Sequence, residues 1–248
     1  MEPIEYERIY QVENQHWWYL GMEAITRAIL DHYGSPAASR KILDAGCGTG
    51  AAMSTYLANY GNVTGFDLSP LALRACQSRK LTSLARASVT DIPFQSDSFD
   101  LVTSFDVLYA VNKDSVAADE FFRVLRPGGL LFLRLPAYNW LRGRHDITVH
   151  TMQRYTSQKV TRLLINSGFR MVHLTYANTF LFPLAMIKRL SERIWPPALD
   201  SSDLSFPVWG LNEIFKQVLY CEAPLASHLC LPFGLSVVAL GQKPYANE

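Results

Sequence analysis

The part of the chain from Arg40 to Leu135 alternates short apolar segments with stretches of helical periodicity. One helical stretch begins at Ser69, a capping hydroxyl, with Pro70 at the first helical position, where its missing N–H costs nothing. Strands that alternate with helices form a parallel sheet covered on both faces. We therefore predict an α/β fold whose strands include the five apolar segments at residues 41–45, 62–66, 84–89, 99–105 and 130–135.

The rest of the chain is less regular. Thr156 is predicted to cap a helix that Gly168 ends. The other predicted elements are helices at residues 1–33, 49–60, 116–125, 180–194 and 208–228, a loop at 196–207, and strands at 169–176 and 235–240. We expect one domain with four parts: an N-terminal helical cap (1–36), a core (37–175), a helical insertion (176–231), and a last strand with the tail (232–248).

Composition limits the function classes. The 248 residues suffice for a large core, and 23 Lys and Arg against 22 Asp and Glu leave a net charge of +1. This balance gives no overall positive electrostatic field that would attract nucleic acid, and the sequence has no basic–aromatic motif for binding it. The charge is uneven locally, because seven basic residues and one acid, Asp146, lie between Arg134 and Arg170.

The apolar segments, the cysteines and the first residues indicate the cellular compartment and the relation to membranes. The longest apolar segments, such as 180–187, are shorter than the roughly 20 residues of a membrane span. The four cysteines lack metal-ligand spacing, and the first residues do not resemble a signal peptide. We therefore expect reduced thiols, no metal site and a cytoplasmic protein.

A glycine-rich turn, Leu43 to Gly50 (LDAGCGTG), follows the first predicted strand. Glycines permit positive φ and let a ligand approach the backbone, and a helix N-terminus offers free N–H groups. The turn also fits the G-x-G-x-x-G/A form of dinucleotide binders, with Ala51 last. Asp44 argues against a pyrophosphate, because its carboxylate suits a ligand ammonium. Asp67, 17 residues after Gly50, ends the second strand, where an acid accepts ribose hydroxyls.

Two further strands end in polar groups at the same predicted edge of the sheet. Asp91 follows the third strand, where its carboxylate can accept from an adenine amino group with Ile92 against the ring. The fourth strand ends at Ser104-Phe105-Asp106. Open α/β sheets bind ligands at this carboxyl edge.

These segments, in this order, resemble the class I S-adenosylmethionine (SAM)-dependent methyltransferases. LDAGCGTG resembles their first glycine motif, GFDLSP their ribose-binding acid, VTDIPF their adenine-binding acid and RPGGLLFL their fifth-strand motif. The resemblance implies a Rossmann-like, mostly parallel seven-stranded sheet with an antiparallel last strand, SAM as methyl donor and S-adenosylhomocysteine as product. The positions it implies for SAM are Asp44, Gly46, Cys47, Gly48, Asp67, Leu68, Asp91, Ile92 and Phe105.

A closer resemblance lies outside the core. His16 to Gly21 (HWWYLG), Arg154-Tyr155-Thr156 and Leu231 to Gly234 (LPFG) are similar to a bacterial subgroup associated with glycan or secondary-metabolite pathways. That subgroup has a basic pair after its glycine, where this chain has Met22 and Glu23. For the aromatic cluster we interpret Trp18 and Tyr19 as a lid over the sulfonium or the acceptor, held in part by cation–π attraction. A plain packed helix is the alternative interpretation.

The acceptor is predicted to be a small molecule such as a sugar, a lipid-linked intermediate or a secondary metabolite. A hydroxyl acceptor needs a general base, and the loop after the fifth strand contributes His145 and His150 as candidates. Guanidinium groups in this region suit a carboxylate or phosphate on the acceptor, and a solvated surface is the alternative. The acceptor-binding candidates are Tyr109, Arg142, Arg144, Arg154 and Tyr155. Residues 180–194, with cations after apolar positions, suit either a core helix of the insertion or contact with a membrane surface.

Two other function classes stay open at this point. One is a catalytically silent SAM-binding subunit, and the other is a nicotinamide-dependent oxidoreductase, which Asp44 and the Asp91 motif disfavour. The sequence leaves the acceptor atom (O, N or C) and the oligomeric state undetermined.

Overall fold

The computed structural model describes residues 1–34, 39–194 and 210–245, with the side chains of residues 144, 145, 193 and 194 outside that description. Its centre is a seven-stranded sheet of order β3-β2-β1-β4-β5-β7-β6. Strand β7 runs antiparallel to both of its neighbours, and the other pairs are parallel. This confirms the predicted fold class. The strands are β1 (Lys41–Ala45), β2 (Asn62–Asp67), β3 (Leu84–Arg86), β4 (Phe99–Phe105), β5 (Leu125–Pro136), β6 (Arg170–Ala177) and β7 (Ser236–Gln242).

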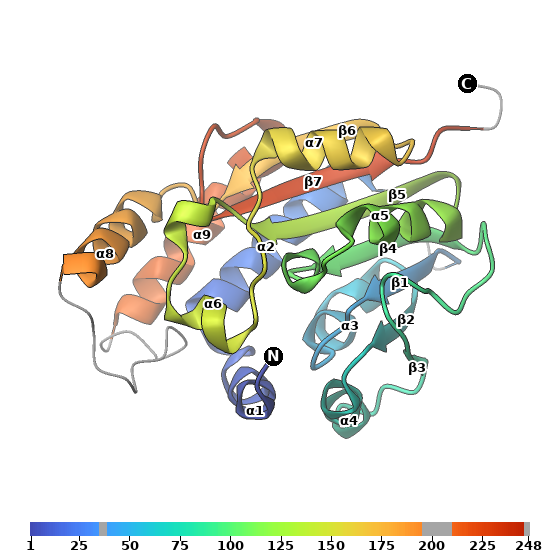
Figure 1. The fold of residues 1–248 in the computed structure, drawn as a ribbon, viewed down its shortest axis with the longest axis horizontal. Helices are drawn as coiled ribbons and strands as arrows, with labels where there is room; N and C mark the ends of the chain where they lie inside the picture. The colour runs from blue at the N-terminus through green and yellow to red at the C-terminus, as the bar shows by residue number, and fades with distance from the viewer. Residues whose placement is uncertain (35–38, 195–209, 246–248) are drawn as a thin grey trace.

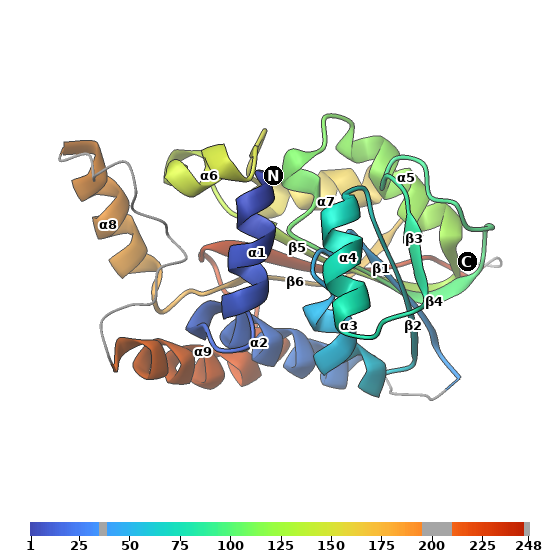
Figure 2. The ribbon, with the colours of Figure 1, turned by 90° about the horizontal axis from the view of Figure 1, so that it is seen from below.

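Helices cover both faces of this sheet (Figures 1 and 2). The helices of the described residues are α1 (Pro3–Val12), α2 (Trp17–Tyr33), α3 (Ala51–Thr55), α4 (Pro70–Ser78), α5 (Asp114–Val124), α6 (Arg144–Thr148), α7 (Ser157–Asn166), α8 (Phe182–Ile194) and α9 (Leu211–His228). Three short 3₁₀ turns accompany them: η1 (Leu57–Asn59), η2 (Leu108–Ala110) and η3 (Asn139–Leu141).

One face of the sheet is covered by α2 and α9, which lie side by side (Figure 2). Helix α2 buries Met22, Ile25 and Ile29, whose spacing of three and four residues places them on one side of the helix. They pack with Leu219 of α9 and with Phe132 of β5. Helices α2 and α9, which come from the predicted N-terminal cap and the predicted helical insertion, therefore form one layer of the main core.

The opposite face is covered by α5 and α7. Phe121 of α5 and Leu164 of α7 are fully buried against the sheet, together with Leu131 of β5. Ser69 and Thr156 cap α4 and α7 as predicted, each accepting a hydrogen bond from a backbone N–H. With a helical layer on each face, polar groups of the sheet are left for a ligand at the ends of the strands.

Several predicted boundaries need correction. The helix expected at 49–60 ends at Thr55 and continues only as η1, and the strand expected at 84–89 ends at Arg86. Strand β5 begins at Leu125 instead of 130, because Arg-Pro-Gly-Gly runs through it with a register shift opposite β4. The loop expected at 196–207 lies outside the described residues.

Helix α1 lies near the edge where the parallel strands end, beside α4 (Figure 2). Its ends are attached to both sides of that edge. The Glu2 N–H donates to the Thr148 carbonyl at the end of α6. At the other end, Glu13 bonds Thr49 in the glycine turn. The helix thus bridges α6 and the turn after β1.

Candidate functional site

The turn after β1 contains glycines whose backbone conformation would be strained in a residue with a side chain. Gly46 and Gly48 have φ of 80° and 55°, in the left-handed region. A Cβ on Gly46 would lie 2.4 Å from a methyl of Val107, whereas a Cβ on Gly48 would meet no atom within 4 Å. The N–H groups of Gly46 and Cys47 both donate to the Phe66 carbonyl. The turn is therefore fixed against β2, with open space beside Gly48.

Asp67 ends β2 next to this turn. Its Oδ2 accepts from the Gly48 N–H at 3.0 Å, and its Oδ1 accepts from the Ser69 N–H at 2.8 Å. Burial raises the pKa of the Asp67 carboxyl, and these N–H groups act against that shift. The carboxylate is thus held in place by backbone groups and is oriented towards the turn. Tyr6 of α1 hydrogen-bonds the Ser69 side chain beside it.

Asp44 is the second-last residue of β1 and is 2% exposed. Its Oδ1 accepts from the Thr103 hydroxyl at 2.8 Å. Burial raises the pKa of Asp44 to about 7, although the Thr103 hydrogen bond and the charge of Arg134 lower it. A buried carboxylate with so little compensation is stabilised by a cation that reaches it. The prediction of a group that suits an ammonium is therefore consistent with its surroundings.

Buried Glu13 connects α1 to the glycine turn, and the sequence contained no signal for it. Both carboxylate oxygens lie 2.6 Å from the Thr49 hydroxyl. The guanidinium of Arg79, the residue after α4, pairs with Glu13 at 2.6 Å and donates to the Thr49 carbonyl at 3.0 Å. These contacts hold α1 over the turn, and α1 in turn places Tyr6 beside Asp67 and Ser69.

A second unpredicted pair lies at the ends of β4 and β5. The Arg134 Nε donates to Asp106 Oδ2 at 2.7 Å, and the Arg134 side chain is 11% exposed. Asp106 has a φ of 53°, a strained value for a residue with a Cβ. In the sequence, Arg134 was one cation of the basic stretch, and only strand register could have placed it beside Asp106.

The residues of the aromatic cluster have two different surroundings: one packs against α9, and the others lie at the edge of the sheet. Trp17 packs edge-to-face on Phe215 of α9. The Trp18 ring lies 5.1 Å from the Arg134 guanidinium carbon, and the Phe105 ring lies 4.9 Å from it. Burial raises the pKa of the Tyr19 hydroxyl well above its usual range, with Glu13 and Asp106 adding to the shift. Trp18, Tyr19 and Phe105 are therefore gathered around Arg134 at this edge.

The residues after β3 are placed less favourably for a ligand. Asp91 is exposed, whereas Ile92 is 3% exposed and packs in the core beneath α5. Leu68, next to Asp67, is 64% exposed. Cys47 is buried, with its sulfur 3.8 Å from that of Cys76. All four cysteines are free thiols.

Two of the predicted acceptor residues belong to the framework of the loop after β5. Arg154 pairs with both oxygens of Asp146 and donates to the Ala137 carbonyl. The Tyr155 side chain is fully buried, and its hydroxyl donates to the Leu108 carbonyl at 3.1 Å. Because their polar groups are satisfied internally, we leave Arg154 and Tyr155 out of the acceptor site.

The other acceptor candidates lie around the same loop. Arg142 is exposed and donates to the carbonyls of Thr151 and Met152. Tyr109, in η2, accepts from the N–H groups of Met152 and Gln153 through its carbonyl. The side chain of Arg144 lies outside the described residues.

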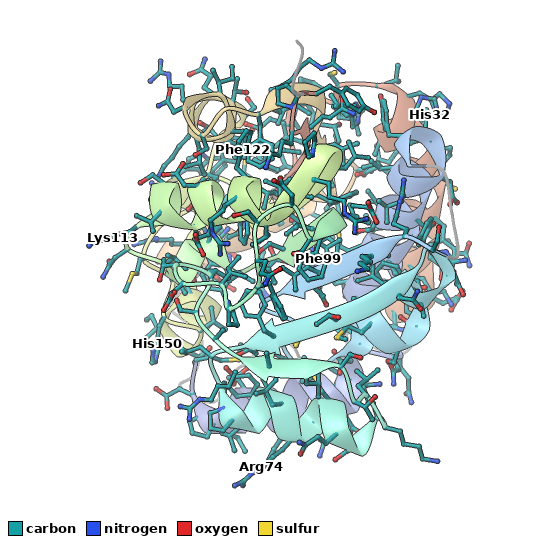
Figure 3. All side chains as sticks on the ribbon, turned by 90° about the vertical axis from the view of Figure 1, so that its right-hand side faces the viewer. His32, Arg74, Phe99, Lys113, Phe122 and His150 are labelled. Atoms are coloured by element: carbon teal, nitrogen blue, oxygen red, sulfur yellow. The ribbon has the colours of Figure 1, made fainter. Side chains whose placement is uncertain are left out.

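His150, one of the two candidate bases, lies at the surface. Figure 3 shows it on the same side of the molecule as Lys113 and far from His32. Its Nε2 is 3.0 Å from Glu2 Oε1, and its side chain is 56% exposed. The side chain of His145, the other candidate, lies outside the described residues.

An open apolar cavity of about 550 Å³ lies between Phe180 and α9. Its lining comes from Phe180, before α8, and from α9: Glu213, Ile214, Gln217, Val218 and Cys221. Within the described ranges, no helix is long and apolar enough to cross a membrane. The same residues contain no group of three metal-ligating side chains.

Comparison with known proteins agrees with this geometry. A family model described as a methyltransferase domain matches residues 43–133, the segment that contains the glycine turn, Asp67 and β4. Residues 43–133 therefore match a methyltransferase domain, and curated methyltransferases resemble the chain over part of its length. One of the curated relatives is named as a probable SAM-dependent methyltransferase, and one solved structure of this fold contains SAM.

The matched part of the chain resembles curated methyltransferases named for different acceptors, among them demethylmenaquinone and malonyl-[acyl-carrier protein]. Demethylmenaquinone methyltransferase from Clavibacter sepedonicus is 33% identical over 126 residues, which cover 49% of this chain and 48% of the relative. The chain spans less than half the length of the first curated relatives it matches.

Two solved structures show the same fold. One is the putative methyltransferase of a complex with the Haloferax volcanii activator Trm112, with a TM-score of 0.64, 17% identity, and coverage of 99% of this chain and 96% of that one. The other is Haemonchus contortus phosphoethanolamine N-methyltransferase 2 bound to SAM, with a TM-score of 0.57, 16% identity, and coverage of 88% of this chain and 52% of that one.

Proposed function

We propose that this protein transfers the methyl group of SAM to a small-molecule acceptor. The observation that supports this most is the pair of carboxylates at neighbouring strand ends. Asp44 is buried, and half-buried Asp67 accepts from the N–H of Gly48, which has open space beside it. Asp44 would hold the ammonium of the donor and Asp67 its ribose hydroxyls. Cys47 and Gly48 would line the pocket with backbone atoms. Leu68, Asp91 and Ile92 remain proposed for the adenine end.

The chemistry needs little covalent participation by the protein. Bound SAM supplies a methyl group already activated on a sulfonium. The residues of the sheet edge hold the donor, and α1 and the aromatic rings of Trp18 and Tyr19 exclude water from it. Alignment and desolvation then account for most of the acceleration of an in-line displacement.

The acceptor is proposed as a small molecule with an apolar part. The cavity between Phe180 and α9 offers apolar contact near the insertion, and one relative is a demethylmenaquinone methyltransferase. Arg142 and Arg144 stay proposed for an anionic group, and Tyr109 for contact with the acceptor. For a hydroxyl acceptor, His145 or His150 is the proposed base. A His150→Ala variant with unchanged rate and unchanged acidic limb of the pH–rate profile would exclude His150.

The proposed function is tested by titration and labelling. S-Adenosylhomocysteine titrated into the protein should bind at one site per chain. Methyl-labelled SAM incubated with pools of quinones, lipids, sugars and amines should then label one pool. Binding without labelling of any pool would favour a silent SAM-binding subunit, and absence of binding would reject the proposal.

A further inference from the structure

The guanidinium of Arg134 has more hydrogen-bonding capacity than the protein uses. Arginine carries five N–H donors in a planar fork. Only the Nε–H has a partner among the described residues, namely Asp106 Oδ2 at 2.7 Å. The side chain is 11% exposed, and its two Nη atoms keep some exposed surface, so this end of the guanidinium can be reached by water or a ligand. A buried polar group with unused donors is unfavourable unless something else accepts from them.

The position of the guanidinium is fixed by its surroundings. Trp18 of α2 and Phe105 of β4 place their rings 5.1 Å and 4.9 Å from its central carbon. Asp106 is fixed in turn, because its N–H donates to the Arg134 carbonyl at 2.8 Å. With Nε bonded to Asp106, the two Nη atoms form the end of the fork that is available to an anion. A carboxylate matches that end with two parallel hydrogen bonds.

Strand register gives the relation between Arg134 and Asp44. Asp44 is paired with Thr103 of β4, Thr103 with Phe132 of β5, and Arg134 follows Phe132 by two residues. Side chains two residues apart on a strand point to the same face. Arg134 and Asp44 are separated by two strand spacings, about 10 Å, and by two residues along the strand, about 7 Å. Long Arg and short Asp side chains on one face can therefore approach the same small ligand from opposite sides.

An α-amino acid group has charges that match this arrangement. Its ammonium suits the buried Asp44 carboxylate, and its carboxylate suits the unused end of the Arg134 fork. We propose that Arg134 binds the carboxylate of the amino-acid part of the methyl donor, opposite Asp44. This inference rests on the proposed function, since it assigns a further residue to the same donor site.

A purely structural ion pair between Arg134 and Asp106 is the competing explanation. It accounts for the Nε contact and the burial, but it gives no role to the two Nη atoms or to the aromatic rings that orient them. The two explanations differ in one respect that can be measured. A binding role depends on the carboxylate of the ligand, and a structural role does not.

The experiment compares SAM with decarboxylated SAM, which keeps the sulfonium and the ammonium and lacks only the carboxylate. Calorimetric titrations at mildly alkaline pH are made on the wild-type protein, Arg134→Gln and the control Arg126→Gln. Arg126 also pairs with an aspartate, Asp100, at 2.7 Å, but at the start of β4. Thermal unfolding of each variant checks that it is folded.

The proposal predicts that wild type binds SAM about 30-fold or more tightly than decarboxylated SAM, as expected for a buried charge-assisted pair. Arg134→Gln should lose about that factor for SAM and change less than about threefold for decarboxylated SAM. Arg126→Gln should bind both ligands as wild type does.

Equal losses for both ligands in Arg134→Gln would assign Arg134 a structural role. If that variant does not fold, the wild-type comparison decides alone, and equal wild-type affinities for the two ligands overturn the inference. A wild-type protein that binds neither ligand rejects the proposed function itself, which is a different result from binding both equally.

Discussion

Two regions of the molecule each contain a buried arginine–aspartate pair, and the pairs differ in how completely they are satisfied. In the loop after β5, Arg154 donates through Nε, Nη1 and Nη2, and Asp146 also accepts from the Gly143 N–H. At the ends of β4 and β5, Arg134 donates one hydrogen bond to Asp106. Burial alone would raise the pKa of Asp146, yet the Arg154 hydrogen bonds hold it below its usual value.

This difference distinguishes a structural pair in the loop after β5 from a pair at the proposed binding site. A satisfied buried pair is costly to break but has nothing left to offer a ligand. The groups at the sheet edge, namely Asp44, Asp67 and Arg134, retain acceptors or donors that the described protein does not use. The comparison therefore predicts that changes at the edge alter binding and that changes in the loop alter stability.

Asp67→Ala gives the largest expected effect. It removes a carboxylate proposed to accept from two ribose hydroxyls, and each charged hydrogen bond contributes about 1.5–3 kcal/mol. The affinity for S-adenosylhomocysteine should fall about 100-fold or more in calorimetry. Asp100→Ala is the matched control, because Asp100 also accepts from a backbone N–H, that of Lys41, at the opposite edge. Equal affinities of the two variants would remove Asp67 from the site.

Arg154→Gln should act on stability. Removing one partner leaves Asp146 buried without its cation, which costs about 3 kcal/mol or more. The midpoint of thermal unfolding should fall by about 6–12 °C, measured by calorimetry or circular dichroism. The affinity of the folded protein for S-adenosylhomocysteine should not change. A weakened affinity with an unchanged midpoint would contradict the distinction between the two regions.

The donor affinity should depend on pH through Asp44. Its pKa of about 7 means that the carboxyl is largely protonated in the free protein at acidic pH. The ammonium of the donor needs the carboxylate, so affinity should rise about tenfold per pH unit up to pH near 7 and level off above it. The raised pKa also implies that the free protein loses stability as pH rises through 7.

Asp44→Asn is the control for this pH dependence, because it keeps the shape and removes the titrating group. It should bind the donor weakly and with a flat pH profile. Titrations in buffers of different ionisation enthalpy should show a proton released on binding to wild type at pH below 7. An unchanged profile in the variant would assign the titration to another group.

Tyr155→Phe gives the smallest expected effect. The hydroxyl donates to a carbonyl in the interior, and its loss should cost about 1–2 kcal/mol of the free energy of unfolding. Denaturant titration measures this, and donor affinity should stay as in wild type. A variant of full stability with impaired turnover would return Tyr155 to the acceptor site.

The fold and the position of the glycine turn and carboxylates at one edge of the sheet are largely predictable from the sequence, because they depend on local patterns. The alternation of strands and helices, the glycine turn and the carboxylates at strand ends are all visible within short segments. The caps Ser69 and Thr156 were predicted for the same reason. Helix 49–60 was overextended, since periodicity does not show that α3 ends after one turn.

The rest of the site depends on contacts between distant residues. Glu13 lies 36 positions from Thr49, and Arg134 lies 28 from Asp106, so neither pair has a sequence pattern. The sequence predicts Arg154 and Tyr155 at the acceptor site, because a sequence does not show whether the hydrogen-bonding groups of a side chain already have partners inside the protein. Only the folded loop shows that the Arg154 guanidinium donates its hydrogen bonds to Asp146 and to the Ala137 carbonyl.

The central claim is that Asp44 and Asp67 form the donor-binding edge of the sheet. A calorimetric titration of the wild-type protein with S-adenosylhomocysteine at neutral pH tests it most directly. The account predicts saturable binding at one site per chain that Asp67→Ala weakens and Asp100→Ala does not. A titration without saturable binding to folded wild-type protein would contradict it.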